Sequence, residues 1–214
     1  LGVGRIGAVV DVEHIARRRA GLGGKPEVVD VHERDVLLAH LVGERNAVDI
    51  TSARDQHVGD RVVDTEGGLD HVLQGRGLQM RGPIAKGMWG YNPNAVQYHR
   101  DVNKAKALLK KAGVSGLELK LIYSERRPTW EQIATILQAN FADIGVTLKP
   151  ELMANPTLRD KIDRGDFELC LGIWSPDYAD PSMFMNFWFD SKNFGLPGNR
   201  AFYKNEKVDG PIRK

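Results

Sequence analysis

Two short loops carry the residues best suited to binding a charged solute. Residues 124–129 read Ser-Glu-Arg-Arg-Pro-Thr, and residues 175–181 read Ser-Pro-Asp-Tyr-Ala-Asp-Pro. Guanidinium groups hold carboxylates, and carboxylates hold ammonium groups, through charge-assisted hydrogen bonds. A fold that brings the two loops together would bind a small zwitterion, such as a peptide, at both of its charged ends. The alternative is structural: Asp177 or Asp180 caps a helix near Pro181, and Arg126 is simply solvated.

The first residues suggest a different chemistry. Residues 2–7 read Gly-Val-Gly-Arg-Ile-Gly, the G-x-G-x-x-G pattern of dinucleotide-binding folds. A working fingerprint needs a strand before the glycines, a helix after them and an acid about 20 residues further on. The acid, Asp30, is present. The preceding strand is missing, because only one residue comes before the motif, and the β-branched residues after the glycines favour a strand in place of the required helix. We interpret the match as accidental. The alternative function, an NAD-dependent oxidoreductase fragment, would use Gly2, Gly4, Gly7 and Asp30.

The overall composition narrows the classes of function. The chain has 214 residues, of which 42% are hydrophobic and 27% charged, and its formal net charge is +2. This balance argues against a dedicated nucleic-acid binder, which usually has a strong basic excess. The single cysteine, Cys170, excludes an internal disulfide. No apolar run reaches the roughly 18 residues of a membrane span, and the first ten residues lack the features of a signal peptide. We expect no metal and no cofactor.

The composition changes sharply along the chain. All 16 aromatic residues (four Trp, five Tyr, seven Phe) lie at or after Trp89. Val, Gly, Asp and Arg together make up 39 of the first 70 residues. One explanation is a small aromatic-poor domain fused to a second domain. The other is that residues 1–68 are translated out of frame from G+C-rich DNA or are disordered, and we leave this segment unassigned.

From about residue 100 the sequence predicts an α/β unit, because helical and strand periodicities alternate. The expected elements are a helix over 101–112, a strand over 117–123, a helix from 129 to 145, a strand over 146–152, a helix over 155–165 and a strand over 167–174. Thr129 and Gln132 would form a capping box at the start of the second helix. Helices that alternate with strands imply parallel strands. Ligands of such sheets gather beyond the carboxyl ends of the strands, where both charged loops lie.

Three stretches also resemble a known family. They are the Tyr-x-x-Asp-x-x-Lys-Ala-Lys-x-Leu-Leu run from Tyr98, the Asp-Ile-Gly-Val turn at Asp143, and Trp-x-x-Asp-Tyr-x-Asp-Pro from Trp174. Together they make residues 69–209 similar to the C-terminal lobe of family 5 solute-binding proteins, the peptide- and nickel-binding components of ABC importers. The resemblance implies an α/β fold, the C-terminal lobe of a type II periplasmic-binding-protein fold. Residues 69–214 would be a partial lobe of this kind.

The resemblance also implies roles for individual residues. Asp177 would pair with the α-amino group of a bound peptide, and Arg127 would hold its carboxylate. Trp174 would line the pocket, with Tyr178 as a further ligand-binding residue. The implied protein is a monomer that binds a small peptide or similar solute, works with ABC permease subunits outside the cytoplasm and performs no chemistry. Family members are considerably longer than this chain, so we expect a fragment with one side of the binding cleft.

Overall fold

The computed structural model describes residues 4–10, 48–50, 72, 77–79, 82–95, 100–111 and 113–214. Within these residues six strands form one sheet in the order β3-β2-β1-β6-β4-β5. The strands are β1 (Gly4–Val10), β2 (Val48–Ile50), β3 (Gly77–Gln79), β4 (Glu118–Ser124), β5 (Thr147–Met153) and β6 (Leu169–Trp174). The helices are α4 (Val102–Lys111), α5 (Pro128–Ala142), α6 (Asn155–Arg164), α7 (Ser182–Phe189) and α8 (Glu206–Ile212), with a 3₁₀ turn η1 (Ser191–Asn193). The expected α/β order after residue 100 is confirmed.

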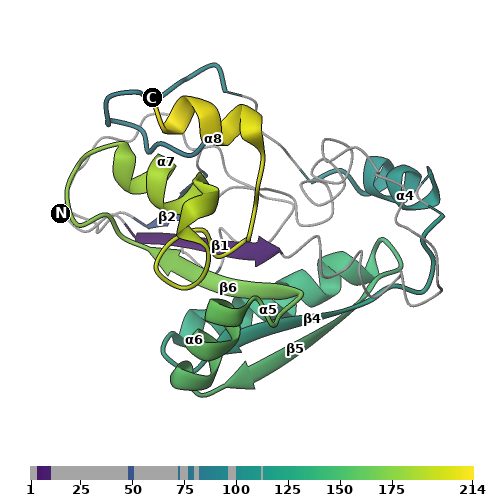
Figure 1. The fold of residues 1–214 in the computed structure, drawn as a ribbon. Helices are drawn as coiled ribbons and strands as arrows, with labels where there is room; N and C mark the ends of the chain where they lie inside the picture. The colour runs from purple at the N-terminus through teal and green to yellow at the C-terminus, as the bar shows by residue number, and fades with distance from the viewer. Residues whose placement is uncertain are drawn as a thin grey trace, which may run out of the picture.

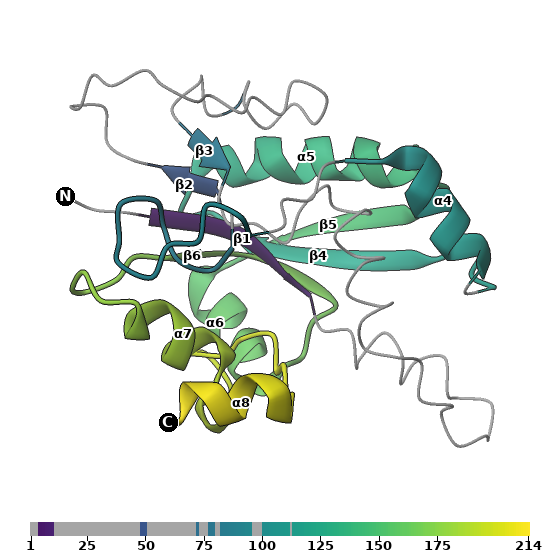
Figure 2. The same cartoon turned by 90° about the horizontal axis from the view of Figure 1, so that it is seen from above.

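The parallel part of the sheet determines where the loops go. β4 pairs in parallel with β5 on one side and with β6 on the other. The chain therefore crosses from β5 over β4 to reach β6, and α6 makes this crossover. Because crossovers of this kind are right-handed, two that run in opposite directions place their helices on opposite faces. Figures 1 and 2 show α5 on one face of the sheet and α6 on the other.

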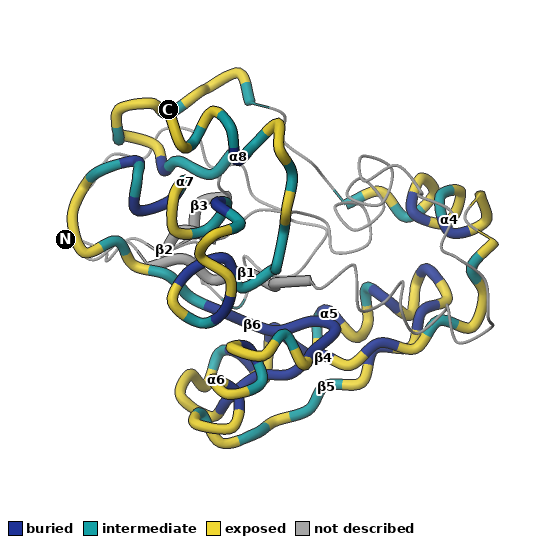
Figure 3. Tube along the Cα trace, in the orientation of Figure 1, coloured by how far each residue is buried: buried dark blue, intermediate teal, exposed yellow. Residues whose placement is uncertain are grey.

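The hydrophobic core lies between these two helices and the parallel strands. In α5 the buried side chains follow helical spacing, and Phe141 is only 1% exposed. The last four residues of β4 are all buried, as are the first four of β6 (Figure 3). Cys170 belongs to this core, with no exposed surface. The central strands are therefore buried over the second half of β4 and the first four residues of β6, whereas Ile173 and Trp174 at the end of β6 are only partly buried.

β1 does not have the geometry of a dinucleotide-binding motif. It runs antiparallel to β6, from the pair Arg5–Trp174 to the pair Val10–Leu169. Gly4 and Gly7 therefore lie inside a strand, whereas the fingerprint needs its glycines in a turn that opens a helix. Gly2 and Asp30 lie outside the described residues. So do residues 11–47 and 51–68, and the domain boundary near residue 69 stays a prediction.

The expected capping box at Thr129 is wrong. α5 begins one residue earlier, at Pro128, and Arg127 is its N-cap residue, with an extended backbone (φ −134°) and no side-chain cap hydrogen bond. The reason is that proline has its φ already fixed near the helical value and lacks an N–H that would need a partner. Arg127 is thereby placed at the junction between the loop and the helix.

The last part of the chain packs back on the sheet through a tight polar turn. In α8 the carboxylate of Asp209 has no exposed surface and accepts hydrogen bonds from the N–H (2.8 Å) and the hydroxyl (2.7 Å) of Ser191. Between η1 and α8 the buried Gly198 lies against two backbone carbonyls. A Cβ at this position would be 2.5 Å from the oxygen of Phe187 and 2.8 Å from that of Asn193. Among the described helices, none is both long and apolar enough to cross a membrane.

The glycine contacts predict opposite effects for one substitution at two positions. Gly198→Ala should lower the free energy of unfolding by about 1 to 3 kcal/mol, because the added methyl group meets backbone atoms that cannot move aside cheaply. Gly210→Ala, inside α8 with nothing within 4 Å of the added Cβ, should be neutral or stabilising. Urea denaturation of both variants measures this difference. A Gly198→Ala variant as stable as Gly210→Ala would contradict the close packing of this turn.

Candidate functional site

The two charged loops leave the sheet at the same edge. Leu121 pairs with Leu169 and Ile122 with Cys170, so β4 and β6 are adjacent and run in the same direction. Their arrows point to the same side of the molecule in Figure 1. Residues 125–127 follow β4 and residues 175–181 follow β6. The juxtaposition expected from the sequence is thus present at the level of the strands.

Glu125 anchors the cationic loop to the start of α6. The Glu125 carboxylate accepts a hydrogen bond from the backbone N–H of Asn155 at 3.3 Å. Asn155 begins α6, whose own N-cap residue provides no side-chain hydrogen bond. A carboxylate at a helix N-terminus is favourable because it satisfies a free N–H and faces the positive end of the helix dipole. Arg126 and Arg127 are exposed, and neither guanidinium pairs with a carboxylate in the described part of the chain.

The two aspartates of the acidic loop, Asp177 and Asp180, have different surroundings. Asp180 accepts a hydrogen bond from the N–H of Ser182 at 2.8 Å, at the first residue of α7. Hydrogen bonds from the Ser182 side chain and backbone hold the pKa of Asp180 below its ordinary value. Asp177 is exposed, and its carboxylate makes no hydrogen bond or ion pair with the residues that the structure describes. Of the two aspartates, Asp180 is therefore the one that contacts the start of α7, where Pro181 occupies the N-cap position without a side-chain cap hydrogen bond. Asp177 makes no such contact and is available for a ligand. Tyr178, beside it, is 57% exposed.

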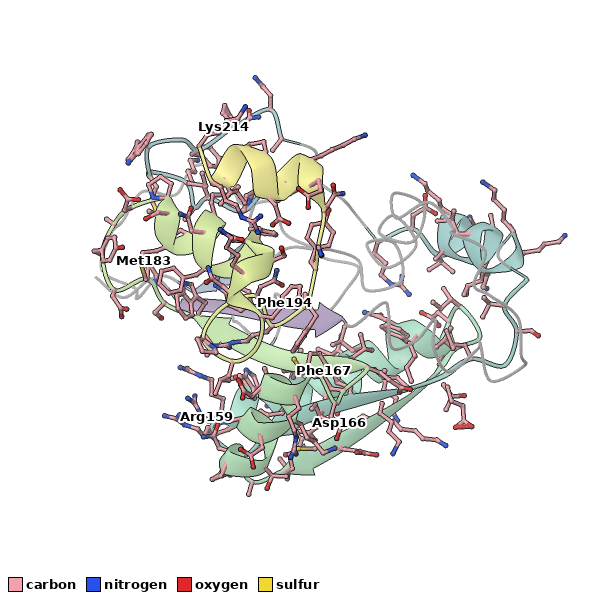
Figure 4. The ribbon with its side chains drawn as sticks, in the orientation of Figure 1. Arg159, Asp166, Phe167, Met183, Phe194 and Lys214 are labelled. Atoms are coloured by element: carbon pink, nitrogen blue, oxygen red, sulfur yellow. The ribbon has the colours of Figure 1, made fainter. Side chains whose placement is uncertain are left out.

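Trp174 is held in an aromatic cluster at the end of β6. Its indole Nε1 donates a hydrogen bond to the carbonyl of Met183 in α7 at 3.2 Å, and Figure 4 labels Met183. The ring centroid lies 5.8 Å from that of Phe187 and 5.7 Å from that of Trp188, the latter nearly perpendicular at 84°. These are the distances at which aromatic rings attract one another through their quadrupoles. Trp174 is only partly buried, so part of it remains accessible.

The sequence analysis missed Arg200, which the fold brings to this cluster. Its guanidinium carbon lies 5.1 Å from the ring centroid of Trp188 and 5.9 Å from that of Trp174. Arg200 stands far from Trp174 in the sequence. The available signal was the Gly-Leu-Pro-Gly run before it, which indicates a turn but not where the turn leads.

The described surface also has a groove that does not coincide with these residues. It is open, has a volume of about 430 Å³ and follows the start of α6, where Figure 4 labels Arg159. Its lining residues are Asn155, Pro156, Arg159, Asp160, Asp163, Leu196 and Pro197. None of the four predicted site residues is among them. The described residues contain no group of three His, Cys, Asp or Glu side chains arranged to hold a metal ion.

The pKa of Asp180 gives a prediction with a defined sign. A carboxyl group whose pKa is lowered by folding stabilises the protein above its unfolded-state pKa of about 3.9, and this stabilisation is lost as the pH falls through the folded-state value. Ser182→Ala removes the side-chain donor, so the pKa of Asp180 should rise toward its ordinary value. Carboxyl NMR titration of both proteins measures it. An unchanged Asp180 pKa in Ser182→Ala would contradict the role of this hydrogen bond.

Comparison with known proteins identifies the family. The family model of bacterial extracellular solute-binding proteins, family 5 Middle, matches residues 61–195, more than half of the chain. The chain is 47% identical over 151 residues to the probable D,D-dipeptide-binding periplasmic protein DdpA of Escherichia coli K12, covering 71% of this chain and 29% of that protein. It is 25% identical over 194 residues to the heme-binding protein A of Haemophilus influenzae, covering 88% and 35%. The chain thus spans about a third of the length of these relatives.

Solved structures agree with this match. HbpA2 from Haemophilus parasuis superposes with a TM-score of 0.73 at 25% identity, over 99% of this chain and 36% of that one. The periplasmic binding protein DppA from Helicobacter pylori, solved with the peptide STSA, gives a TM-score of 0.72 at 20% identity, over 99% and 35%. The expected periplasmic-binding-protein fold is confirmed. The chain belongs to the family 5 bacterial extracellular solute-binding proteins.

Proposed function

We propose that the chain binds dipeptides at the carboxyl edge of β4 and β6, as part of the solute-binding component of an ABC importer. The observation that supports this proposal is the exit of a cationic loop and an acidic loop from two adjacent parallel strands. The names of the relatives point in the same direction, because DdpA is called a probable D,D-dipeptide-binding protein and another E. coli relative a dipeptide-binding protein. In this proposal the protein releases its ligand unchanged and has no catalytic residues.

The proposed roles follow from charge and exposure. Asp177 pairs with the α-ammonium group of the ligand, and Arg127 with its carboxylate. Both side chains are exposed and have no counter-charge within the described residues, so neither must give up an ion pair to bind. Trp174 provides an apolar wall, and the exposed Tyr178 is a further ligand-binding residue.

The spacing of the strands favours a short peptide. Neighbouring strands lie about 4.8 Å apart. An extended dipeptide separates its charged ends by about two residue lengths, roughly 7 Å. We propose that two loops that leave neighbouring strands suit the separation of a dipeptide's charged ends better than that of a longer peptide. A pentapeptide held at both ends would need more than twice the distance.

The proposed ligand class, location and partners depend on the relatives. The identity of 47% to the E. coli D,D-dipeptide-binding protein makes D,D-dipeptides the first ligands to test. That relative is named as periplasmic, so the proposed location is outside the cytoplasm. The proposed partners are the permease subunits of an ABC importer, which the chain would serve as a monomer.

Calorimetric titration with modified dipeptides tests the two charge contacts separately. The chain should bind D-Ala-D-Ala, and binding should weaken when the ligand is N-acetylated or carries a C-terminal amide. Asp177→Asn should weaken binding of D-Ala-D-Ala by about 1 kcal/mol or less, because Asp177 is exposed and solvent screens an exposed ion pair. Asp177→Asn should also abolish the difference in affinity between D-Ala-D-Ala and its N-acetylated form. Arg127→Met should abolish the difference in affinity between D-Ala-D-Ala and its C-terminal amide.

Two control variants and one comparison ligand complete the design. Asp160→Asn and Arg164→Met change exposed charges on α6 and should leave all affinities unchanged. L-Ala-L-Ala reports the preference for ligand chirality. If no dipeptide binds, the proposed function is wrong. If dipeptides bind and Asp177→Asn or Arg127→Met leaves the preferences intact, the site is elsewhere on the chain.

A further inference from the structure

The turn that carries Arg200 is rigidly built. Asn199 has no exposed surface, and its side chain donates to the carbonyl of Tyr203 at 2.7 Å and accepts from the N–H of Tyr203 at 3.1 Å. The N–H of Asn199 donates to the carbonyl of Asn193 at 2.7 Å. The neighbouring Gly198 leaves no room for a side chain. The backbone from which Arg200 projects is therefore fixed on both sides.

The guanidinium group of Arg200 is fixed by carbonyls and rings. Its Nε donates to the carbonyl of Leu196 at 2.9 Å, and one terminal nitrogen donates to the carbonyl of Ile173 at 3.5 Å. The same group lies within 6 Å of the ring centroids of Trp174 and Trp188. At this distance an arginine is attracted to the face of an indole by the ring quadrupole. Arg200 thus joins the end of β6, α7 and the turn after η1.

Arg200 differs from the ion-paired arginine nearby. Arg213 donates to the carboxylate of Asp190 at 2.5 and 3.0 Å, a conventional structural ion pair. No carboxylate among the described residues lies within ion-pair distance of Arg200. Burial lowers the pKa of Arg200, with a smaller contribution in the same direction from Arg159. Holding the Arg200 cation in a partly buried position without a carboxylate partner in the described part of the chain costs free energy. The contacts with the aromatic rings and the backbone carbonyls offset this cost.

Trp174 is the residue at which these contacts meet. Its Nε1 is held by Met183, its ring by Trp188 and Phe187, and Arg200 adds a cationic contact to the ring. Without Arg200 the indole would lose this contact, and the strand end at Ile173 would lose a donor. We propose that Arg200 is a positioning residue that fixes the orientation of the Trp174 indole for ligand binding. Its effect on affinity rests on the proposed function, whereas its effect on the indole does not.

The orientation of the indole can be measured without a ligand. Two indoles 5.7 Å apart are close enough for exciton coupling in circular dichroism, and the amplitude of the resulting couplet changes when either ring reorients. Arg200→Met keeps the length of the side chain and removes the charge and the donors, so the amplitude of the couplet should change. The matched control Arg164→Met removes an exposed arginine of α6 and should leave it unchanged. Trp174→Ala defines the signal without the pair.

Affinity for D-Ala-D-Ala separates positioning from direct contact. Arg200→Met should weaken binding about tenfold, equivalent to about 1.4 kcal/mol. If Arg200 acts through Trp174, it should cause no further loss in a Trp174→Ala background, because residues that act as one unit are not additive. Equal losses in both backgrounds would show that Arg200 touches the ligand itself or acts elsewhere, and would overturn the proposal. So would an unchanged couplet in Arg200→Met.

A second variant covers the case in which Arg200→Met does not fold. Arg200→Lys keeps the charge but loses the planar fork that reaches two carbonyls at once. It should therefore also change the amplitude of the couplet, and it provides the test if Arg200→Met does not fold. An unchanged couplet in Arg200→Lys would overturn the proposal in that case. If the wild-type chain binds no dipeptide and the couplet still changes in Arg200→Met, the proposed function fails while the positioning role stands.

Discussion

The arrangement of the site depends on the parallel pairing of β4 with β6. This pairing exists because α6 carries the chain across β4 instead of continuing outward from β5. It places two strand ends side by side that are far apart in the sequence. The loop after one strand is cationic, and the loop after the other is acidic. If β6 had paired beyond β5, the two loops would be separated by two strand spacings, and neither the charge match nor the support of Trp174 by α7 would follow in this form.

The sequence predicted the elements of this unit well because each of them is specified locally. Pro128 and Pro156 mark helix starts, Gly165 ends α6 in the left-handed conformation, and the strands show their own periodicity. The start of α5 was misplaced by one residue, because a strong proline preference for the first helical turn outweighed the hydroxyl of Thr129. Such local competition is decided by small differences in free energy.

The contacts around the candidate site were harder to predict, because they join distant segments. That Glu125 would cap α6, and that Arg200 would lie between two indoles, follows from the three-dimensional path of the chain and not from spacing. The sequence did offer both roles for the aspartates of the second loop. Only the hydrogen bond from the N–H of Ser182 to Asp180 shows which of them contacts the start of α7.

The pairing of β1 with β6 has a mechanical consequence for Trp174. Arg5 lies opposite Trp174 in the ladder, so the last residue of β6 pairs with the first described segment of the chain, whereas β4 pairs with β6 only at Leu169 and Cys170. The end of β6 is therefore held on one side, by β1, while its beginning has a paired neighbour on both sides. A backbone rearrangement at this tryptophan would therefore break only the pairing with β1, while the start of β6 stays fixed between β1 and β4.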